Sequence, residues 1–283
     1  MEEINKKIIL LYEGGVSNKK ISSDLNIHRS TVQKILKRNG TKLHKRKSEI
    51  ICNKCFFSEY NENSCYWAGF ILADGYIRKT RNSLHIKLKK EDREHLVKFL
   101  KCLEIEKNSI EKLIKEGKDY FSIDLHFDEL KNDLELKFKI KNKKTFDAEI
   151  FYKIPQKYIH HFIRGYFDGD GSISRAVNKK GIIYPQFSFI GTIKVLDTIS
   201  NYFFKNGIKT RNETGKPVFQ LRYKKNVGSI YYFGYKKLIL FHKLLYKNSN
   251  ELIELKRKKE TILDFINIKQ HERLFRRQNQ KQI

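Results

Sequence analysis

The sequence predicts an α+β protein built from two similar halves, with a small all-α module in front of them. First, the segment at residues 67–77 recurs at residues 163–173 with one constant offset, so that Gly69 corresponds to Gly165. Second, segments of alternating apolar and polar residues, typical of half-buried strands, follow each copy. Third, the first 39 residues show only helical spacing. A length of 283 residues suits about two domains, at roughly 100–200 residues per domain.

The N-terminal module, residues 1–39, is predicted to be a helix-turn-helix. Ile4, Ile8 and Leu11 repeat at helical spacing before the Gly14-Gly15 stop, and Ser17 is a suitable N-cap for the next short helix. Asn26 then supplies a tight turn into a further helix. The segment from residue 17 to 37 resembles the helix-turn-helix of resolvase-like and regulator proteins. The alternative is a three-helix bundle that binds nothing.

The last helix of this module carries polar side chains that can reach base edges and phosphates in a major groove. The residues expected to contact DNA there are His28, Arg29, Ser30, Thr31, Gln33 and Lys34. Residues 40–58 read as a basic linker, in which Lys45, Arg46 and Lys47 are expected to contact the phosphate backbone. Residues 270–283 form a second basic segment, a tail.

The charge balance points to a polyanionic partner. The chain has 59 Lys and Arg against 32 Asp and Glu, a net charge of +27. Such a surplus favours nucleic acid over a membrane as the partner. Four cysteines are too few for a disulfide scaffold and indicate a reducing compartment. Since no apolar run of roughly 18 residues occurs, we expect a cytoplasmic protein with no membrane partner.

Each repeat begins with a hydrophobic helix that ends in Asp-Gly, at Asp74-Gly75 and at Asp170-Gly171. After each helix the pattern reads hairpin, helix, hairpin, helix. The first half is placed at residues 59–152 and the second at residues 153–269.

The strands predicted in both halves have one apolar and one polar face. Leu84, Ile86 and Leu88 alternate with His85, Lys87 and Lys89, and Phe219, Leu221 and Tyr223 alternate with Gln220, Arg222 and Lys224. A basic, hydrogen-bonding sheet face suits a nucleic-acid duplex better than a small-molecule pocket. The DNA-contacting residues expected in the two halves are Arg78, His85, Lys87, Lys89, Arg175, Gln186, Ser188, Gln220 and Arg222.

The two Asp-Gly helices resemble the LAGLIDADG motif of homing endonucleases, and the resemblance spans roughly residues 60 to 265. It implies two αββαββα subdomains related by a pseudo-dyad, with a curved sheet over DNA. Gly69 and Gly165 leave little side chain where the two motif helices would cross, so the backbones can approach closely. Gly75 and Gly171 are expected to be left-handed helix C-caps.

The last aspartate of each motif is the predicted catalytic centre. Asp74 and Asp170 each lie at the negative end of a helix dipole, and pairing the helices adds like-charge repulsion. Divalent cations would remove both penalties, and oxygen ligands suit Mg²⁺, with Mn²⁺ a plausible substitute. The resemblance implies the same role and adds the backbone carbonyls of Ala73 and Gly169 as metal ligands.

Three details qualify the motif match. Leu72 replaces the earlier aspartate of the first copy, whereas the second copy keeps Asp168; Arg164 replaces a small residue, and Gly169 replaces an alanine. The earlier aspartate is not a metal ligand in the family, so the assignment of the metal ligands is unaffected. Family sites also carry basic residues near the scissile phosphates, and Lys224 is the candidate for that catalytic role.

These observations favour a site-specific homing endonuclease that makes a metal-dependent double-strand break in a long asymmetric DNA target. Because one chain contains both motifs, the active species is expected to be a monomer on double-stranded DNA. Two alternatives stay open: an intron maturase that binds structured RNA, and a catalytically inactive DNA-binding regulator with the same fold.

Overall fold

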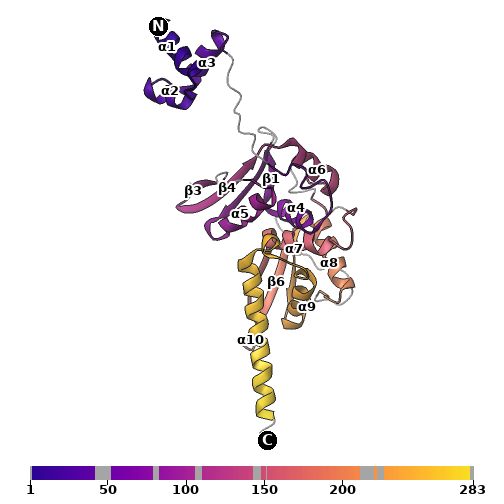
Figure 1. Ribbon diagram of the computed structural model, residues 1–283. Coiled ribbons are helices and arrows are strands. Elements are labelled where there is room, and N and C mark those ends of the chain that lie inside the picture. Colours follow the sequence, from indigo (N-terminus) through magenta and orange to yellow (C-terminus); the bar gives the residue numbers. More distant parts are fainter. Residues whose placement is uncertain are drawn as a thin grey trace. The chain divides into compact units, whose positions relative to one another are not determined.

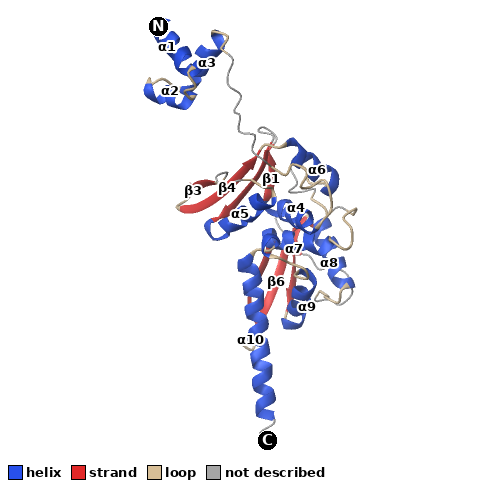
Figure 2. Ribbon diagram, in the orientation of Figure 1, coloured by secondary structure: helices blue, strands red, loops and turns tan. Residues whose placement is uncertain are grey.

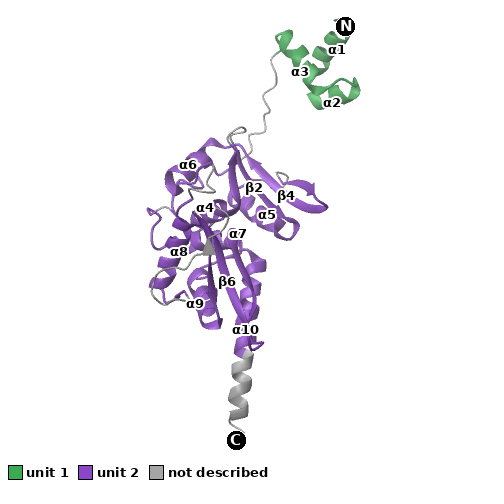
Figure 3. Cartoon of the chain, turned by 180° about the vertical axis from the view of Figure 1, so that it is seen from behind, with its two compact units in different colours: residues 1–50 green, residues 51–283 purple. Residues whose placement is uncertain are grey.

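The chain forms two compact units, residues 1–50 and residues 51–283 (Figure 3). The structure is a computed structural model, and it describes residues 2–41, 52–78, 83–105, 110–142, 148–150, 152–210, 220–221 and 226–280. For residues 220–221 and 271–280 it describes the backbone alone.

The first unit is a three-helix domain with its own small core. Its helices are α1 (Glu2–Glu13), α2 (Asn18–Asp24) and α3 (Arg29–Arg38). The predicted cap is confirmed, because the side chain of Ser17 accepts a hydrogen bond from the amide of Lys20. Asn26 makes the turn with a positive φ of 49°. The buried side chains are Ile8, Tyr12, Ile21, Val32 and Leu36.

The second unit contains the two predicted αββαββα repeats, so the α+β class is confirmed. The first comprises α4 (Glu62–Asp74), β1 (Gly75–Arg78), β2 (Ser83–Lys89), α5 (Arg93–Cys102), β3 (Glu111–Lys115), β4 (Lys118–Leu125) and α6 (Asp128–Phe138). The second comprises α7 (Ile159–Asp170), β5 (Gly171–Val177), β6 (Ile183–Thr192), α8 (Ile193–Lys205), β7 (Gln220–Leu221), β8 (Val227–Phe233) and α9 (Tyr235–Leu245).

The two antiparallel sheets have the same strand order, β1-β2-β4-β3 and β5-β6-β8-β7. Helices cover one face of each sheet (Figure 2). As the alternation predicts, Leu84, Ile86 and Leu88 are buried toward these helices, while Lys87 and Lys89 are exposed on the other face. The sheet positions therefore separate a packed side from a polar side.

The motif helices α4 and α7 lie side by side at the centre of this unit, between the two sheets (Figure 1). A Cβ atom added to Gly69 would lie 2.0 Å from the carbonyl oxygen of Phe162 on α7. One added to Gly165 would lie 1.9 Å from the carbonyl oxygen of Tyr66 on α4. The close crossing expected from these two glycines is thus present, and one continuous core joins both halves.

The prediction of left-handed caps at Gly75 and Gly171 is wrong. Their φ angles are −77° and −82°, which is extended backbone, and each glycine leads directly into a strand. Glycine is required there by space, because an added Cβ would lie 2.8 Å from the carbonyl oxygen of Ile71 or 2.4 Å from that of Phe167.

The chain continues past the second repeat into an additional helix. After α9, residues 246–255 include the short 3₁₀ helix η3 (Glu251–Ile253) and lead into α10 (Lys256–Gln280). We call residues 245–258 the C-terminal strap, because this segment runs against both motif helices.

Candidate active site and DNA-binding surface

The structure brings the ends of the two motif helices together. A Cβ atom on Gly169 would lie 2.4 Å from the Cβ of Ala73 and 3.4 Å from a carboxylate oxygen of Asp74. Burial raises the pKa of Tyr166 well above its usual value, and the carboxylates of Asp170 and Asp74 raise it further. The Tyr166 hydroxyl is therefore close enough to both carboxylates for each to affect its pKa.

A lysine that the sequence reasoning missed lies at this same place. The Nζ of Lys258, on α10, donates to the carbonyl oxygens of Phe167 at 2.7 Å, Asp168 at 2.8 Å, Gly169 at 3.1 Å and Gly171 at 2.6 Å. Its side chain is only 6% exposed. In sequence it belongs to the run of residues 256–259, which looks like ordinary solvent-facing charge.

Lys258 places a positive charge close to the predicted metal site. Burial lowers the pKa of Lys258 to about 8, and the carboxylates of Asp168, Asp74 and Asp170 oppose that shift. An ammonium at a helix C-terminus also offsets the negative end of the helix dipole. A buried ammonium therefore lies at the end of the helix that carries Asp170.

The donor set at the motif ends consists of oxygen atoms, which suits a hard cation such as Mg²⁺. It comprises the carboxylates of Asp74 and Asp170 and the carbonyls of Ala73 and Gly169, the last of which receives the hydrogen bond from Lys258. Over the described part of the chain, no group of three or more His, Cys, Asp and Glu side chains could hold a metal ion. A metal here would thus depend on two carboxylates and backbone oxygens.

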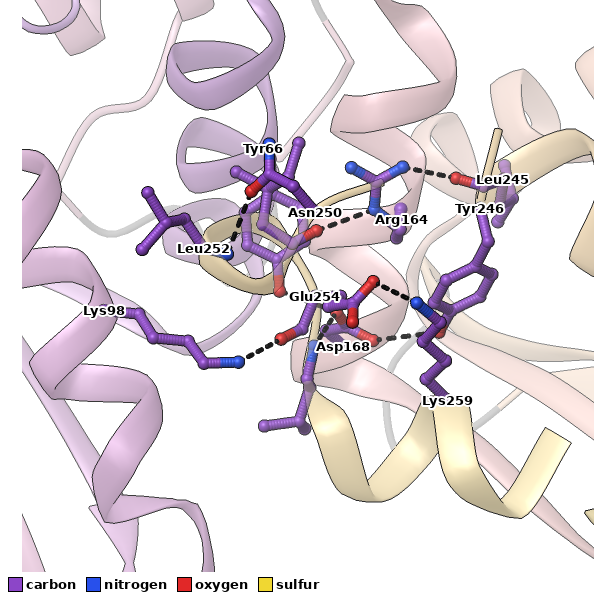
Figure 4. Close-up of polar contacts among 12 residues, drawn as sticks. Tyr66, Lys98, Arg164, Asp168, Leu245, Tyr246, Asn250, Leu252, Glu254 and Lys259 are labelled. Carbon is purple, nitrogen blue, oxygen red and sulfur yellow. Dashed lines mark hydrogen bonds and ion pairs between the residues drawn. The ribbon is translucent and has the colours of Figure 1, made fainter. Parts of the chain in front are cut away.

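Asp168, the earlier aspartate of the second motif, binds the strap (Figure 4). It is 2% exposed and accepts hydrogen bonds from the Tyr66 hydroxyl at 2.6 Å and the Leu255 amide at 2.7 Å. The Tyr246 hydroxyl donates to its other oxygen at 3.4 Å. Burial raises the pKa of Asp168 to about 6, against the lowering effect of Lys258 and these hydrogen bonds.

The structure gives a reason for Arg164, which stands where the motif has a small residue. Its side chain also holds the strap (Figure 4). It is fully buried, and its guanidinium donates to the carbonyl oxygens of Ile253 and Leu245. A third hydrogen bond, of 2.8 Å, goes to Nδ1 of His161. The extra cation in the motif helix therefore satisfies backbone acceptors of a segment that the family pattern did not predict.

The first half also contacts the strap. The Nζ of Lys98 on α5 donates to the Glu254 carbonyl at 3.0 Å. Arg257 forms a bidentate ion pair with Asp92, with N···O distances of 3.1 and 2.8 Å. The strap is consequently held by side chains from both repeats, at the level of the motif-helix ends.

The polar face of the first sheet gathers Arg78, His85, Lys87 and Lys89. Arg78 donates to Asp124 at 2.7 Å, and Ser83 donates to the other oxygen of Asp124 at 3.0 Å. The His85 ring lies 3.4 Å from that second oxygen. The sequence reasoning missed Asp124, although its place opposite His85 on the neighbouring strand gives the signal.

The polar face of the second sheet carries hydroxyl and amide groups in the described strands. Gln186 pairs with Ser174 and Ser188 pairs with Ser172 across β5 and β6, on the face opposite Phe187. Arg175 alternates with Ser174 and lines a small cavity of about 120 Å³ with Asp264 and Phe265 of α10. Because Arg175 pairs with Pro185, it lies on the opposite face of the sheet from Gln186 and Ser188.

Several predicted contacts lie outside what the structure describes. Only the backbone of Gln220 is described, and the residues outside the described ranges are Arg222, Lys224, Lys45, Arg46 and Lys47.

In the first unit, the predicted DNA-reading residues surround the start of α3. The Nδ1 of His28 accepts a hydrogen bond from the Ser30 amide and caps the helix, so His28 precedes the helix on which it was predicted. The side chains of Arg29, Ser30, Thr31, Gln33 and Lys34 are exposed.

Among the described residues, none of the helices combines the length and the apolar character that a membrane span requires.

Comparisons with known proteins agree with these two architectures. Residues 157–266 match the family model of the LAGLIDADG-like domain, and residues 2–43 match that of the homeodomain-like domain. A probable translation initiation factor IF-2 of Methanocaldococcus jannaschii is 28% identical over 210 residues. That alignment covers 69% of this chain but 16% of the relative, so the chain spans a small part of that protein.

Similar solved structures are LAGLIDADG enzymes in complex with DNA. The meganuclease I-AabMI bound to uncleaved DNA has a TM-score of 0.47 and 14% identity, covering 76% of this chain and 92% of its own. I-SmaMI, bound to an uncleaved DNA target in the presence of calcium ions, has a TM-score of 0.44 and 14% identity, covering 76% and 93%.

The family matches locate the same two modules that the structure shows separately, a three-helix domain at the N-terminus and a repeat containing the second Asp-Gly helix. The described first repeat has the same element order and strand order as the second. Residues 157–266 therefore form a LAGLIDADG-like domain and residues 2–43 form a homeodomain-like domain, and the first repeat has the architecture of the second.

Proposed function

We propose that this protein is a site-specific DNA endonuclease of the homing type, which cuts both strands of a long asymmetric target. The observation that carries the proposal is the convergence of Asp74 and Asp170 at the ends of two crossed helices, between two sheets with polar faces. A paired-carboxylate centre flanked by two similar binding surfaces suits a duplex with two scissile phosphates.

The site residues have distinct roles in this proposal. Asp74 and Asp170, with the carbonyls of Ala73 and Gly169, hold Mg²⁺ or Mn²⁺. A metal held there would supply Lewis-acid stabilisation of the phosphate and would lower the pKa of the attacking water. Lys224 remains the candidate for the basic residue at the scissile phosphate.

Affinity and sequence preference come from the sheets and the first unit. On the first sheet, Lys87 and Lys89 are exposed and suit contacts with phosphates. The hydrogen bond to Asp124 fixes the orientation of the Arg78 guanidinium, which suits contact with a base edge. On the second sheet, the half-buried Gln186 offers hydrogen bonds without charge, whereas Ser188 is buried. The exposed residues at the start of α3 suit contacts with a separate stretch of the same duplex.

The test separates chemistry from binding. A target duplex is first selected from a randomised DNA library with the full-length protein. Asp74→Asn and Asp170→Asn are then expected to abolish double-strand cleavage in Mg²⁺ while the target Kd changes by less than about threefold. Asp197→Asn, on the exposed face of α8, is the control and should cleave normally.

Three outcomes would overturn the proposal. Full cleavage by both asparagine variants would refute the metal assignment. Tight, sequence-specific binding by a wild-type protein that cuts its selected duplex in neither Mg²⁺ nor Mn²⁺ would instead indicate a DNA-binding regulator. Preference for structured RNA over duplex DNA in a competition assay would indicate a maturase.

A further inference from the structure

Lys258 has an environment that ordinary surface lysines lack. Four backbone carbonyls at the end of α7 surround its ammonium at 2.6–3.1 Å, including that of Gly171 beyond the helix. The ammonium also lies over the ring of Phe167, 5.2 Å from its centre. An ammonium has only three N–H donors, so these contacts use its full hydrogen-bonding capacity.

The charges that face Lys258 are mostly negative. Asp168, Asp74 and Asp170 all act on it, and Arg257 is the opposing cation. Helix α7 adds the negative end of its dipole at the same point. Without Lys258, the carboxylates of Asp74, Asp168 and Asp170 and the negative end of the α7 dipole would have one buried cation fewer beside them.

The strap places Lys258 there. Asp168 binds the Leu255 amide three residues before Lys258, and Arg164 binds the Ile253 carbonyl two residues earlier. Both anchors are buried members of α7 itself. The same helix whose end needs a cation therefore holds the segment that delivers one.

We propose that Lys258 is a resident cation of the second motif, and that Asp168 and Arg164 are the residues that position it. It compensates the aspartate pair before metal and DNA bind, and it keeps the carbonyl of Gly169 ordered. The proposal concerns the site described under the proposed function, but it rests on that function only in assigning Gly169 as a metal ligand.

The test is a thermal unfolding cycle on the full-length protein in EDTA, so that metal ions play no part. Lys258→Met is compared with wild type, each with and without the pair of changes Asp74→Asn and Asp170→Asn. In wild type the neutral pair should leave Tm unchanged or lower it. In the Lys258→Met protein the neutral pair should raise Tm, because it removes the carboxylates that Lys258 no longer compensates.

Lys256→Met, an exposed change in the same helix, is the matched control and should not alter the effect of the neutral pair. If the neutral pair shifts Tm equally with and without Lys258, the lysine has only a packing role and the proposal is wrong. If Lys258→Met alone is insoluble, recovery of soluble, cooperatively unfolding protein in the combined variant supports the proposal, and continued insolubility counts against it.

The role of Asp168 in positioning Lys258 is tested by a separate measurement. Asp168→Asn should increase hydrogen exchange across the strap and make the neutral pair raise Tm, as Lys258→Met does. Unchanged exchange, or a neutral pair that acts as in wild type, would refute the role of Asp168. Because none of these measurements uses cleavage, a wild-type protein that fails to cut DNA would overturn the proposed function and leave this cycle intact.

Discussion

At the scale of single residues, two glycines determine how closely the halves of this protein approach. Gly69 and Gly165 face each other's helix backbone, and an added Cβ at either would lie about 2 Å from a carbonyl oxygen. Backbone atoms cannot rotate away as a flexible side chain can, so relief requires a shift of a whole helix.

We therefore expect Gly69→Ala and Gly165→Ala each to lower the free energy of unfolding of the second unit by at least about 2 kcal/mol. Lys205→Ala, an exposed position in α8, should have little effect. Urea unfolding followed by circular dichroism measures the change. A glycine variant as stable as wild type would show that the helices do not cross as described.

A buried histidine beside Arg164 should make stability depend on pH. Nδ1 of His161 must accept from Arg164, since a guanidinium can only donate, so the ring is neutral in the folded protein. Burial is the main cause that lowers the pKa of His161 to about 3, and Arg164 and His160 lower it further. Glu62 lies 3.7 Å from the other ring nitrogen and is partly exposed.

The lowered pKa of His161 determines the direction in which stability changes with pH. Above about pH 6.5 the ring is neutral in both the folded and unfolded chain. As the pH falls toward 3 the unfolded chain gains a proton first, so stability is lost by up to about 1.4 kcal/mol per pH unit from this group. His161→Gln should reduce the loss of Tm between pH 6.5 and 4.5, whereas His126→Gln, at an exposed site, should not.

At the scale of elements, the helix-turn-helix is a domain with its own core, distinct from the second unit. The exposed residues of α3 suit a major groove, and the aspartate pair belongs entirely to the other unit. Anchoring and chemistry are therefore carried by different elements.

Deletion of residues 1–39 is expected to weaken target binding about tenfold or more and to shorten the DNase footprint at one end. Cleavage should persist at high protein concentration, because Asp74 and Asp170 are retained. Arg29→Ala with Gln33→Ala should produce the same footprint change without a deletion. An unchanged footprint in both proteins would assign the module another role, such as binding a protein.

At the scale of the whole molecule, a charge of +27 is spread over both units and should dominate the affinity for DNA. Both motifs come from one chain, so a single copy supplies both carboxylates. We expect one protein chain per duplex in sedimentation velocity, and a second chain in the complex would contradict this.

The affinity should also fall steeply with salt. Each phosphate contact contributes a slope of about −0.9 in log affinity against log salt, so many contacts predict a loss on the order of 10³-fold or more between 50 and 200 mM. Lys87→Ala should make the slope shallower by about one for every sequence tested. A flat salt dependence would mean that the lysines do not contact phosphates.

The sequence by itself determined the repeated architecture, because its signals are local and periodic. The alternation through Leu84, Ile86 and Leu88 defines the buried face of a strand, and the spacing of Ile8, Ile21 and Val32 defines a small helical core. The paired Asp-Gly helices and their constant offset predicted two related halves with Asp74 and Asp170 at their junction.

Only the tertiary structure decided what surrounds those aspartates. Lys258 is far from Asp170 in sequence and stands among other lysines, and nothing local distinguishes a lysine that reaches a helix end from one in water. Arg164 and Asp168 likewise acquire their roles from the strap, which packs on them after the end of α9. A buried charge without a partner is costly, so each of these side chains needs one. Their partners are far apart in the sequence, and the linear pattern of residues does not record which of them folding brings together.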